Sequence, residues 1–316
     1  MSVTEAPPGT PRRRSLFGTA NLHGGWRSAF WFLLPALLGF VAFYLYPALR
    51  GLYISFTDWN LIANQGSWVG TDNYDRLFND RQVWESLKIT FKYTVINIAS
   101  QTILAVFIAV LMDRLTKSVT IRGILLLPWL IPNVIVALLW VWMLDGNLGI
   151  VNDFLGLFGM DPVRFFTDTG KVIPTLAGIN TWRHMGYTAL LIFAGLQTIP
   201  RSLYEAAAVD GATERQMFRD VTIPLLRPIL ALVLVITIVG SLQVFDTVFV
   251  ATGGFGGQPG GPANASRVIY LYIYQNAFDF NQLGYAATIS VLLVAILLTV
   301  TFLQLKLLRA GESDLA

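Results

Sequence analysis

The chain contains no cysteine and carries little charge for its length of 316 residues. The absence of cysteine excludes disulfide bonds, thiolate metal sites and cysteine nucleophiles. Charged residues make up 13% of the sequence, about half the share that is usual in a soluble domain. The net charge of +3 is too small to indicate a nucleic-acid partner. Because 54% of the residues are hydrophobic, the composition predicts a membrane protein.

Six apolar segments are long enough to cross a bilayer as helices, which takes about 20 residues each. The first segment carries no charge and lacks a small-residue cleavage site, so it is predicted to be a retained anchor and not a removed signal peptide. No alternation of apolar and polar residues is long enough to suggest a barrel. The predicted spans are 30–49, 89–112, 123–144, 174–199, 228–252 and 285–308.

The fold class that follows is an all-α membrane protein with a six-helix domain over 26–310. Residues 1–25 are rich in Pro, Gly, Ser and Thr, which predicts a disordered tail, and 311–316 form a second, short tail. Lysine and arginine exceed acidic residues in the segments on one side of the predicted spans, the side that holds both termini. The positive-inside rule places that side in the cytoplasm. Pro128 and Pro132 are expected to kink the third span.

Residues 205–228 read EAAAVDGATERQMFRDVTIPLLRP and form a compact charged segment between two apolar spans. Its alanines leave little side chain in the way, so a short helix here can lie very close to another surface. Asp210-Gly211 is a turn signal, and the apolar residues after it recur at helical spacing beside charged ones. The pattern predicts two short helices lying across the cytoplasmic face. A surface connector with no partner fits the same spacing.

This segment resembles the EAA loop of bacterial ATP-binding-cassette (ABC) importer permeases. The family pattern is Glu-Ala-Ala, a three-residue spacer, Gly, a longer spacer and then Ile-x-Leu-Pro, and here the shorter Ile223-Pro224 stands in the place of the last motif. The resemblance implies that the loop 200–227 is the coupling element, which docks onto a separate ATPase subunit. The residues assigned to coupling in this way are Glu205, Ala206, Ala207, Asp210, Gly211, Phe218 and Pro224.

Other stretches resemble the carbohydrate-uptake, maltose-type branch of these permeases. They are FVAFYLYPALRGLYISFTDWN, WRHMGYTALLIFAGLQTIPRSLYEAA, VFDTVFVATGG and QLGYAATIS. Two places depart from the family pattern: the loose glycine-rich run after Thr252, and Arg183-His184, where many relatives are less polar. Both departures concern which sugar is carried and leave the coupling inference intact.

The resemblance also implies a set of partners. They are a second homologous permease, two ATPase subunits that bind ATP and Mg, an extracytoplasmic sugar-binding protein and the lipid of a bacterial inner membrane. No phosphate-binding G-x-x-x-x-G-K-[ST] motif occurs in the sequence. We therefore expect ATP hydrolysis to take place on the partner subunits. The chain itself is expected to be neither an enzyme nor the holder of a cofactor or metal.

Polar residues inside the predicted spans are costly in lipid and usually face a cavity or each other. Asn97 and Gln101 lie one turn apart and so share a face. Asp246 and Arg183 fall at similar depths when the helical rise is counted, which allows a salt bridge serving as a structural pair, a gate or a contact to sugar. The residues predicted to line the substrate path are Ser241, Gln243, Phe245, Asp246, Asn97, Gln101 and Arg183.

Two other classes of protein compete with this interpretation. An ion-coupled secondary transporter could use Asp246 and Arg183 as its ion site, but it leaves the Glu-Ala-Ala loop unexplained, and the sequence shows no inverted repeat. An intramembrane enzyme would need converging catalytic groups, which two histidines and no cysteine do not supply. Within the ABC class, the cargo is a sugar or a polyol phosphate such as a glycerophosphodiester, and Arg183 would suit an anion.

Overall fold

The computed structural model describes residues 22–115, 118–253 and 259–308. Within these ranges the chain forms helices joined by turns and loops, with isolated β-bridges but no strand. The predicted all-α class is therefore confirmed. The chain divides into two compact units, residues 1–53 and 54–316.

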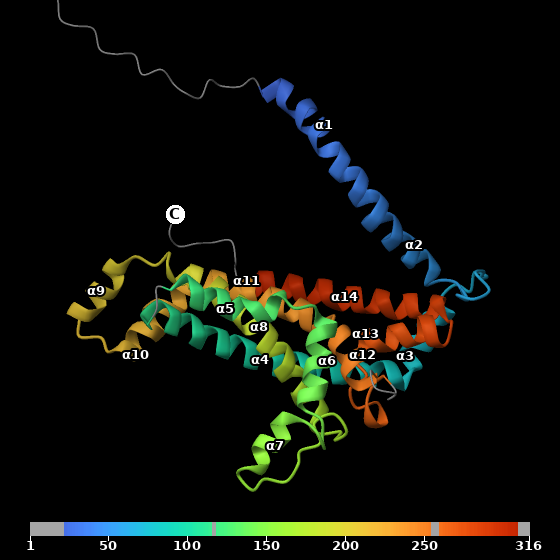
Figure 1. The fold of residues 1–316 in the computed structure, drawn as a ribbon. Coiled ribbons are helices and arrows are strands. Elements are labelled where there is room, and N and C mark those ends of the chain that lie inside the picture. Colours follow the sequence, from blue (N-terminus) through green and yellow to red (C-terminus); the bar gives the residue numbers. More distant parts are fainter. Residues whose placement is uncertain (1–21, 116–117, 254–258, 309–316) are drawn as a thin grey trace, which may run out of the picture. The chain divides into compact units, whose positions relative to one another are not determined.

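The first unit consists of helical segments that follow one another directly along the chain (Figure 1, blue). They are α1 (Leu22–Phe40), the π-helix η1 (Val41–Leu45) and α2 (Tyr46–Ile54). The predicted span 30–49 lies inside this run, in which Ala29–Ile54 is long and apolar enough to cross a membrane. Residues 22–25 are helical, so the predicted disordered tail extended too far. The rest of that tail and residues 311–316 lie outside the described residues.

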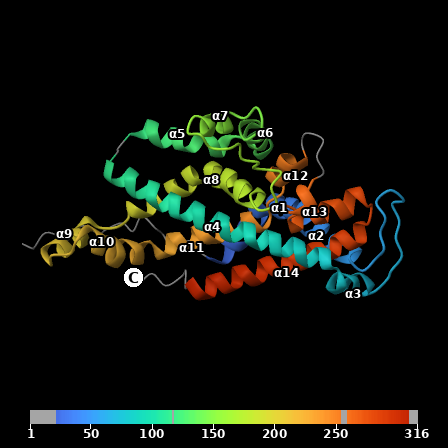
Figure 2. The same cartoon turned by 90° about the horizontal axis from the view of Figure 1, so that it is seen from below.

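Four long helices form the body of the second unit (Figures 1 and 2). They are α4 (Arg81–Leu115), α8 (Val172–Leu196), α11 (Ile223–Leu242) and α14 (Leu283–Leu308). With 35 residues, α4 is about 52 Å long at 1.5 Å per residue. It packs along α8 and α11, and α14 packs against α11. Ala105, Ala109 and Met112 recur one turn apart on α4 and meet Ile192 and Leu226 in one apolar core, so the contact face of α4 follows the helical period.

The predicted number of six spans is not confirmed. In the described part of the chain, four helical stretches are long and apolar enough to cross a membrane, or up to five if one sharply bent pair counts as a span. Helix α8 has the length, at 25 residues, but it carries Asn180, Arg183 and His184 and is not among these stretches. Its polar groups face the interior of the protein, as described below.

The third predicted span, 123–144, is not one helix. It is divided into α5 (Val119–Leu130) and α6 (Asn133–Met143), which meet at an angle of 92°. The break falls at Ile131 and Pro132, both in extended conformations. A proline disfavours helical backbone at the residue before it and donates no hydrogen bond. The expected proline bend is thus present at Pro132, whereas Pro128 lies inside α5.

The fifth predicted span, 228–252, is also wrong as a single helix. Helix α11 begins earlier than predicted and ends at Leu242, and α12 (Asp246–Gly253) starts after a three-residue break. An aspartate is favourable in the first turn of a helix because it complements the helix dipole. Asp246 therefore favours the start of a new helix at a point where average hydropathy gives no warning.

Smaller elements gather at the end of the second unit that includes α3. The helices α3 (Asp72–Asn79) and α13 (Ile269–Tyr274) and the π-helix η4 (Gln275–Asp279) lie there. The helix α7 (Ile150–Gly156) lies apart from them, below α6 (Figure 1), and the short helix η3 is Pro262–Asn264. The Asp80 carboxylate accepts hydrogen bonds from the hydroxyls of Tyr272, at 2.8 Å, and Tyr285, at 2.7 Å. Burial by itself raises the pKa of Asp80, but these hydrogen bonds outweigh it, so the pKa lies below its ordinary value. One carboxylate thus ties the start of α4 to α13 and α14.

Helices α5 and α8 approach closely because α8 has a glycine at their crossing. A Cβ added at Gly186 would lie 1.8 Å from the carbonyl oxygen of Leu125. Next to it, the rings of Trp129 and Tyr187 stack with centroids 4.6 Å apart and planes 8° apart. The missing side chain therefore sets the distance at which the two helices pack.

We expect Gly186→Ala to destabilise the protein by about 1–3 kcal/mol, because overpacking at a backbone contact forces the helices apart. Gly178→Ala on the same helix is the matched control, since a Cβ there meets nothing within 4 Å; alanine should leave stability unchanged or raise it slightly. Thermal unfolding in detergent measures both variants. Equal unfolding midpoints for the two variants would show that the close crossing is not a constraint.

Candidate functional site

A cavity of about 620 Å³ lies where α4, α8 and α11 meet the two helix breaks. Six of the seven residues predicted for the substrate path line it, and Arg183 is the one that does not. The six are Asn97, Gln101, Ser241, Gln243, Phe245 and Asp246. The structure therefore brings together residues that lie up to 149 positions apart in the sequence. Two of the six, Gln243 and Phe245, lie in the α11–α12 break, and two more, Ser241 and Asp246, lie in the helices on either side of it.

Asn97 is the centre of a buried hydrogen-bond network that joins three helices. Its Nδ2 donates to Ser241 Oγ on α11 at 2.8 Å, and its Oδ1 accepts from Asn180 Nδ2 on α8 at 2.9 Å. The Asn97 side chain is 1% exposed, so water cannot replace these partners cheaply. The sequence indicated that Asn97 has a polar partner, but it did not indicate Asn180 as one of them.

One turn further along α4, Gln101 extends the same network. Its Nε2 lies 2.9 Å from Thr188 Oγ1 on α8 and 3.4 Å from Thr237 Oγ1 on α11. The two threonines were not predicted. Sequence spacing pointed to Thr237, because it stands one turn before Ser241. In the structure the Ser241 hydroxyl donates a 2.6 Å hydrogen bond to the backbone carbonyl of Thr237. Gln101 and Asn97 together thus hold α4 against both neighbours.

Arg183 does not form the salt bridge with Asp246 that the spacing allowed: no such ion pair occurs among the described residues, although the two charges still attract each other over a longer distance. Arg183 Nε and Nη2 donate to the backbone carbonyls of Ile131 and Trp129, each at 3.1 Å. These carbonyls end α5, where cationic side chains are favourable. The spacing did not reveal this arrangement, because helical rise gives depth but does not show backbone acceptors left free by a broken helix.

His184 is held in one neutral form by its two neighbours. Its Nδ1 is 3.0 Å from the carbonyl oxygen of Asn180, and its Nε2 is 2.9 Å from Arg183 Nη1. A carbonyl only accepts and a guanidinium only donates, so Nδ1 carries the proton and Nε2 accepts. The His184 ring positions Arg183. Both of its nitrogens are engaged, so its contacts do not indicate a proton relay.

Asp246 is bound instead by the residue that starts α6. Asn133 Nδ2 donates to Asp246 Oδ2 at 3.0 Å. Because Asn133 is the first residue of α6 and Asp246 the first of α12, this hydrogen bond joins the two helix breaks to each other. Both side chains line the cavity. The Asp246 carboxylate remains exposed there, so it is available to a ligand.

Aromatic faces complete the wall of the cavity. The stacked pair of Trp129 and Tyr187 lies on one part of the lining, and Phe245 and Tyr270, with ring centroids 5.6 Å apart, lie on another. Phe245 was predicted, but the other three aromatic residues were not. The cavity thus combines amides, hydroxyls, one carboxylate and aromatic surfaces, the mixture that polyhydroxylated ligands require.

The second predicted site, the charged segment, begins with helix α9 (Arg201–Val209). The N–H of Gly211 donates to the carbonyl of Ala208 at 3.1 Å, and that of Ala212 to the carbonyl of Ala207 at 2.9 Å. This is the Schellman arrangement, which requires a left-handed residue after the helix. Gly211 has φ of +77°, a conformation that glycine adopts without strain.

The second half of this segment differs from the predicted pair of separate helices. Thr213 and Gln216 form a capping box at the start of α10 (Glu214–Met217), a signal in T-x-x-Q that the sequence offered and the prediction missed. The chain then continues through the π-helix η2 (Phe218–Thr222) directly into α11. Pro224 lies inside this continuous run, two residues after the end of η2, and does not interrupt it.

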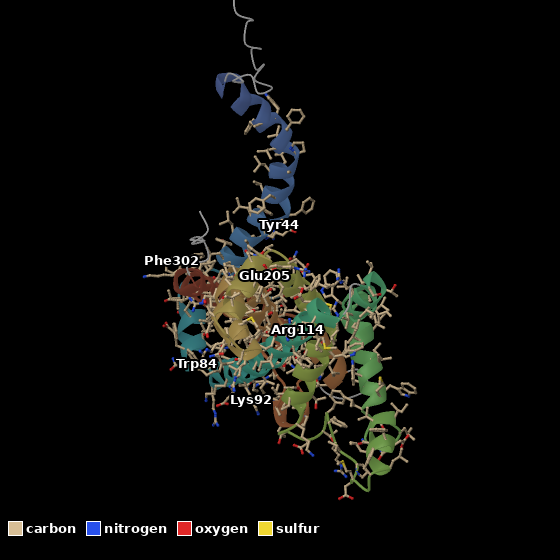
Figure 3. All side chains as sticks on the ribbon, turned by 90° about the vertical axis from the view of Figure 1, so that its left-hand side faces the viewer. Tyr44, Trp84, Lys92, Arg114, Glu205 and Phe302 are labelled. Atoms are coloured by element: carbon tan, nitrogen blue, oxygen red, sulfur yellow. The ribbon has the colours of Figure 1, made fainter. Side chains whose placement is uncertain are left out.

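A groove of about 590 Å³ lies between this segment and the ends of α4 and α8. Glu205 and Phe218 line it, while the other predicted coupling residues do not; these are Ala206, Ala207, Asp210, Gly211 and Pro224. Figure 3 views the protein from this end, with Glu205 and Arg114 labelled. Arg114 at the end of α4 forms an ion pair with Glu214. This ion pair therefore joins the end of α4 to the start of α10 beside the groove.

Comparison with known proteins shows similarity to one family over most of the chain. Residues 101–310 match the model of the binding-protein-dependent transport system inner membrane component. The sulfoquinovosyl glycerol transport system permease SmoG of Agrobacterium fabrum is 32% identical, over 89% of this chain and 90% of its own. The trehalose/maltose transport system permease MalF of Thermococcus litoralis is 31% identical, over 88% of this chain and 92% of its own.

Solved structures give the same result. A bacterial ABC transporter involved in the import of the acidic polysaccharide alginate has a chain that superposes with a TM-score of 0.79 at 25% identity, covering 93% of this chain and 98% of that one. A second structure, of the alginate transporter with an alginate-pentasaccharide-bound periplasmic protein, gives a TM-score of 0.76 at 25% identity, covering 90% and 94%.

The network predicts a stability effect that can be measured directly. Asn97→Ala leaves Ser241 Oγ and Asn180 Nδ2 without their shared partner, and we expect a loss of about 1–3 kcal/mol. Ser290→Ala is the control, because the Ser290 hydroxyl bonds only a carbonyl of its own helix, at 2.9 Å; its effect should be small. Unfolding in detergent is the measurement. An Asn97→Ala variant as stable as wild type would contradict the central place given to this amide.

Proposed function

The chain belongs to the binding-protein-dependent transport system inner membrane components, the permeases of ABC importers, and we propose that it forms half of the path by which such an importer takes up a carbohydrate. The observation that supports this most is the cavity at the two helix breaks, with its amides, hydroxyls and aromatic faces. A second, homologous permease supplies the other half of the path in this proposal.

The chemistry of the cavity suits a sugar. Hydroxyl groups need both donors and acceptors, which Gln243, Asn133 and Asp246 provide, and the C–H faces of a sugar ring lie well against aromatic rings such as Phe245 and Tyr270. Several relatives are named for sugars, among them trehalose/maltose and arabinooligosaccharides. These names support a carbohydrate as the cargo of this chain.

The end of the second unit that carries α9 is the proposed docking face for the ATPase. It lies at the opposite end of α4 from α3 (Figures 1 and 2). In this proposal two ATPase subunits bind and hydrolyse ATP with Mg, and the permease itself is not catalytic. The α9 end and both termini then lie in the cytoplasm, and a sugar-binding protein delivers its ligand from the other side of the inner membrane.

The ion-coupled alternative has no support from the comparisons, which match ABC permeases instead. In the structure, Arg183 donates to the carbonyls at the end of α5 and Asp246 accepts from Asn133.

The docking proposal makes a specific prediction about Gly211. A Cβ at this position meets nothing within 4 Å, so a substitution acts through the positive φ and not through a clash. Gly211→Val should cost about 1–2 kcal/mol in local strain and lower the co-purified ATPase activity by roughly tenfold. Gly211→Asn should retain most of the co-purified ATPase activity, because asparagine tolerates a positive φ.

The measurement is ATPase activity that co-purifies with tagged protein from membranes of the native host in mild detergent. Wild type should bring down an ATPase that a sugar-loaded binding protein stimulates. Purification of wild type without any ATPase, or equal activity with wild type and Gly211→Val, would count against the coupling role of this turn.

A further inference from the structure

We propose that the cavity admits neutral polyhydroxylated ligands and disfavours anionic ones, and that Asp246 is the residue that makes this distinction. The inference rests on the proposed function, since it names the charge class of the ligand in the same cavity. It goes beyond family membership, because the structural relatives include an importer of an acidic polysaccharide and the family therefore leaves the charge of the ligand open.

The charges around the cavity are the first argument. Asp246 is the only acidic residue in the lining that the structure describes, and neither lysine nor arginine is present there. The remaining polar groups of the lining are amides, hydroxyls, one histidine and the indole and phenol of its aromatic residues. A sugar hydroxyl can donate to the carboxylate, whereas a carboxylate, sulfonate or phosphate on the ligand cannot.

Arg183 is the nearest candidate for an anion-binding group, and it is already engaged. Its three side-chain nitrogens contact the carbonyls of Ile131 and Trp129 and Nε2 of His184. Moving the guanidinium into the cavity would free the two carbonyls at the broken end of α5, which is unfavourable inside a protein. Arg183 attracts Asp246 electrostatically, but it does not line the cavity and its nitrogens are engaged, so an anionic ligand would find no cation free to bind it directly.

His184 does not supply a cation in place of Arg183. The proton on Nδ1 is directed to the carbonyl of Asn180, and Nε2 accepts from Arg183. Binding a second proton would set an imidazolium N–H against the guanidinium. The histidine thus stays neutral while Arg183 keeps its place, and Asp246 is the one charged side chain in the described lining that a ligand meets directly.

Repulsion from one carboxylate is large enough to select between ligands. Two like charges about 6 Å apart repel strongly even at the effective dielectric of a protein surface. Because Asp246 is exposed to the cavity, water screens part of its field, and the nearby Arg183 guanidinium offsets another part. We therefore expect a preference of about tenfold for a neutral over an anionic molecule of equal size, which is less than the bare repulsion between two charges would give.

The cysteine-free sequence allows this preference to be measured without knowing the natural ligand. Gly240 lines the cavity, and a Cβ built there meets nothing within 4 Å, so Gly240→Cys places a single thiol in open space. The variant is kept in permeabilised membranes of its native host, so no partner subunit has to co-purify. It is then treated with methanethiosulfonate reagents that are neutral (hydroxyethyl), anionic (ethylsulfonate) or cationic (ethyltrimethylammonium), and the mass of this chain is followed with time.

Each rate is divided by the rate of the same reagent with a small thiol in solution, which removes intrinsic reactivity. The neutral reagent should then react about tenfold faster than the anionic one. In the matched double variant Gly240→Cys with Asp246→Asn, the two normalised rates should become similar, and the advantage of the cationic reagent should disappear. Gln243→Cys is a second reporter on the same wall in case Gly240→Cys does not assemble.

Three results would overturn the proposal. They are an anionic reagent that reacts as fast as the neutral one, a preference that survives Asp246→Asn, and a thiol that none of the reagents reaches. The outcome is independent of the coupling test, because labelling needs no ATP and no transport. Failure of ATPase to co-purify would weaken the proposed function and leave the charge preference standing. Loss of the charge preference would overturn this inference and leave the proposed function standing.

Discussion

The structure depends on a buried amide that serves three helices at once. Asn97 contacts both Ser241 and Asn180 while almost fully withdrawn from solvent. Each of its partners would be costly to leave unpaired in a membrane interior, so the network sets how α8 and α11 lie against α4. The cavity opens just beside it because both nearby helix breaks interrupt the packing there. A polar network and two breaks together make a polar space inside an otherwise apolar bundle.

Continuity along the chain links that space to the charged segment. The stretch Glu214–Leu242 is helical throughout its 29 residues, so it runs from the corner at Thr213 to the break that lines the cavity. One helical run therefore connects the two predicted sites along the chain, and it contains the π-helix η2 as well as Pro224 and Pro228. The corner itself is fixed by a Schellman turn on one side and a capping box on the other, which together set the direction of the chain there.

Much of the fold, and fewer of its details, could be predicted from the sequence. Hydropathy located the long helices, because burial in lipid demands length and apolarity, and the polar residues inside them pointed to six members of the cavity. Averaging over a window concealed the break before Asp246. The Arg183–Asp246 salt bridge that the spacing allowed does not form, because Arg183 donates instead to backbone carbonyls that are left free where Pro132 ends α5. Tertiary consequences of a local break are not visible in composition or spacing.

The most direct test of the account asks which end of the protein meets the ATPase. Val209→Cys, 88% exposed at the end of α9, and Ile62→Cys, 79% exposed near α3, are each labelled with a photoreactive maleimide in native membranes and irradiated. The account predicts an adduct with an ATP-binding subunit from Val209→Cys and none from Ile62→Cys. An ATP-binding subunit linked to the Ile62 position, or to neither, would contradict it.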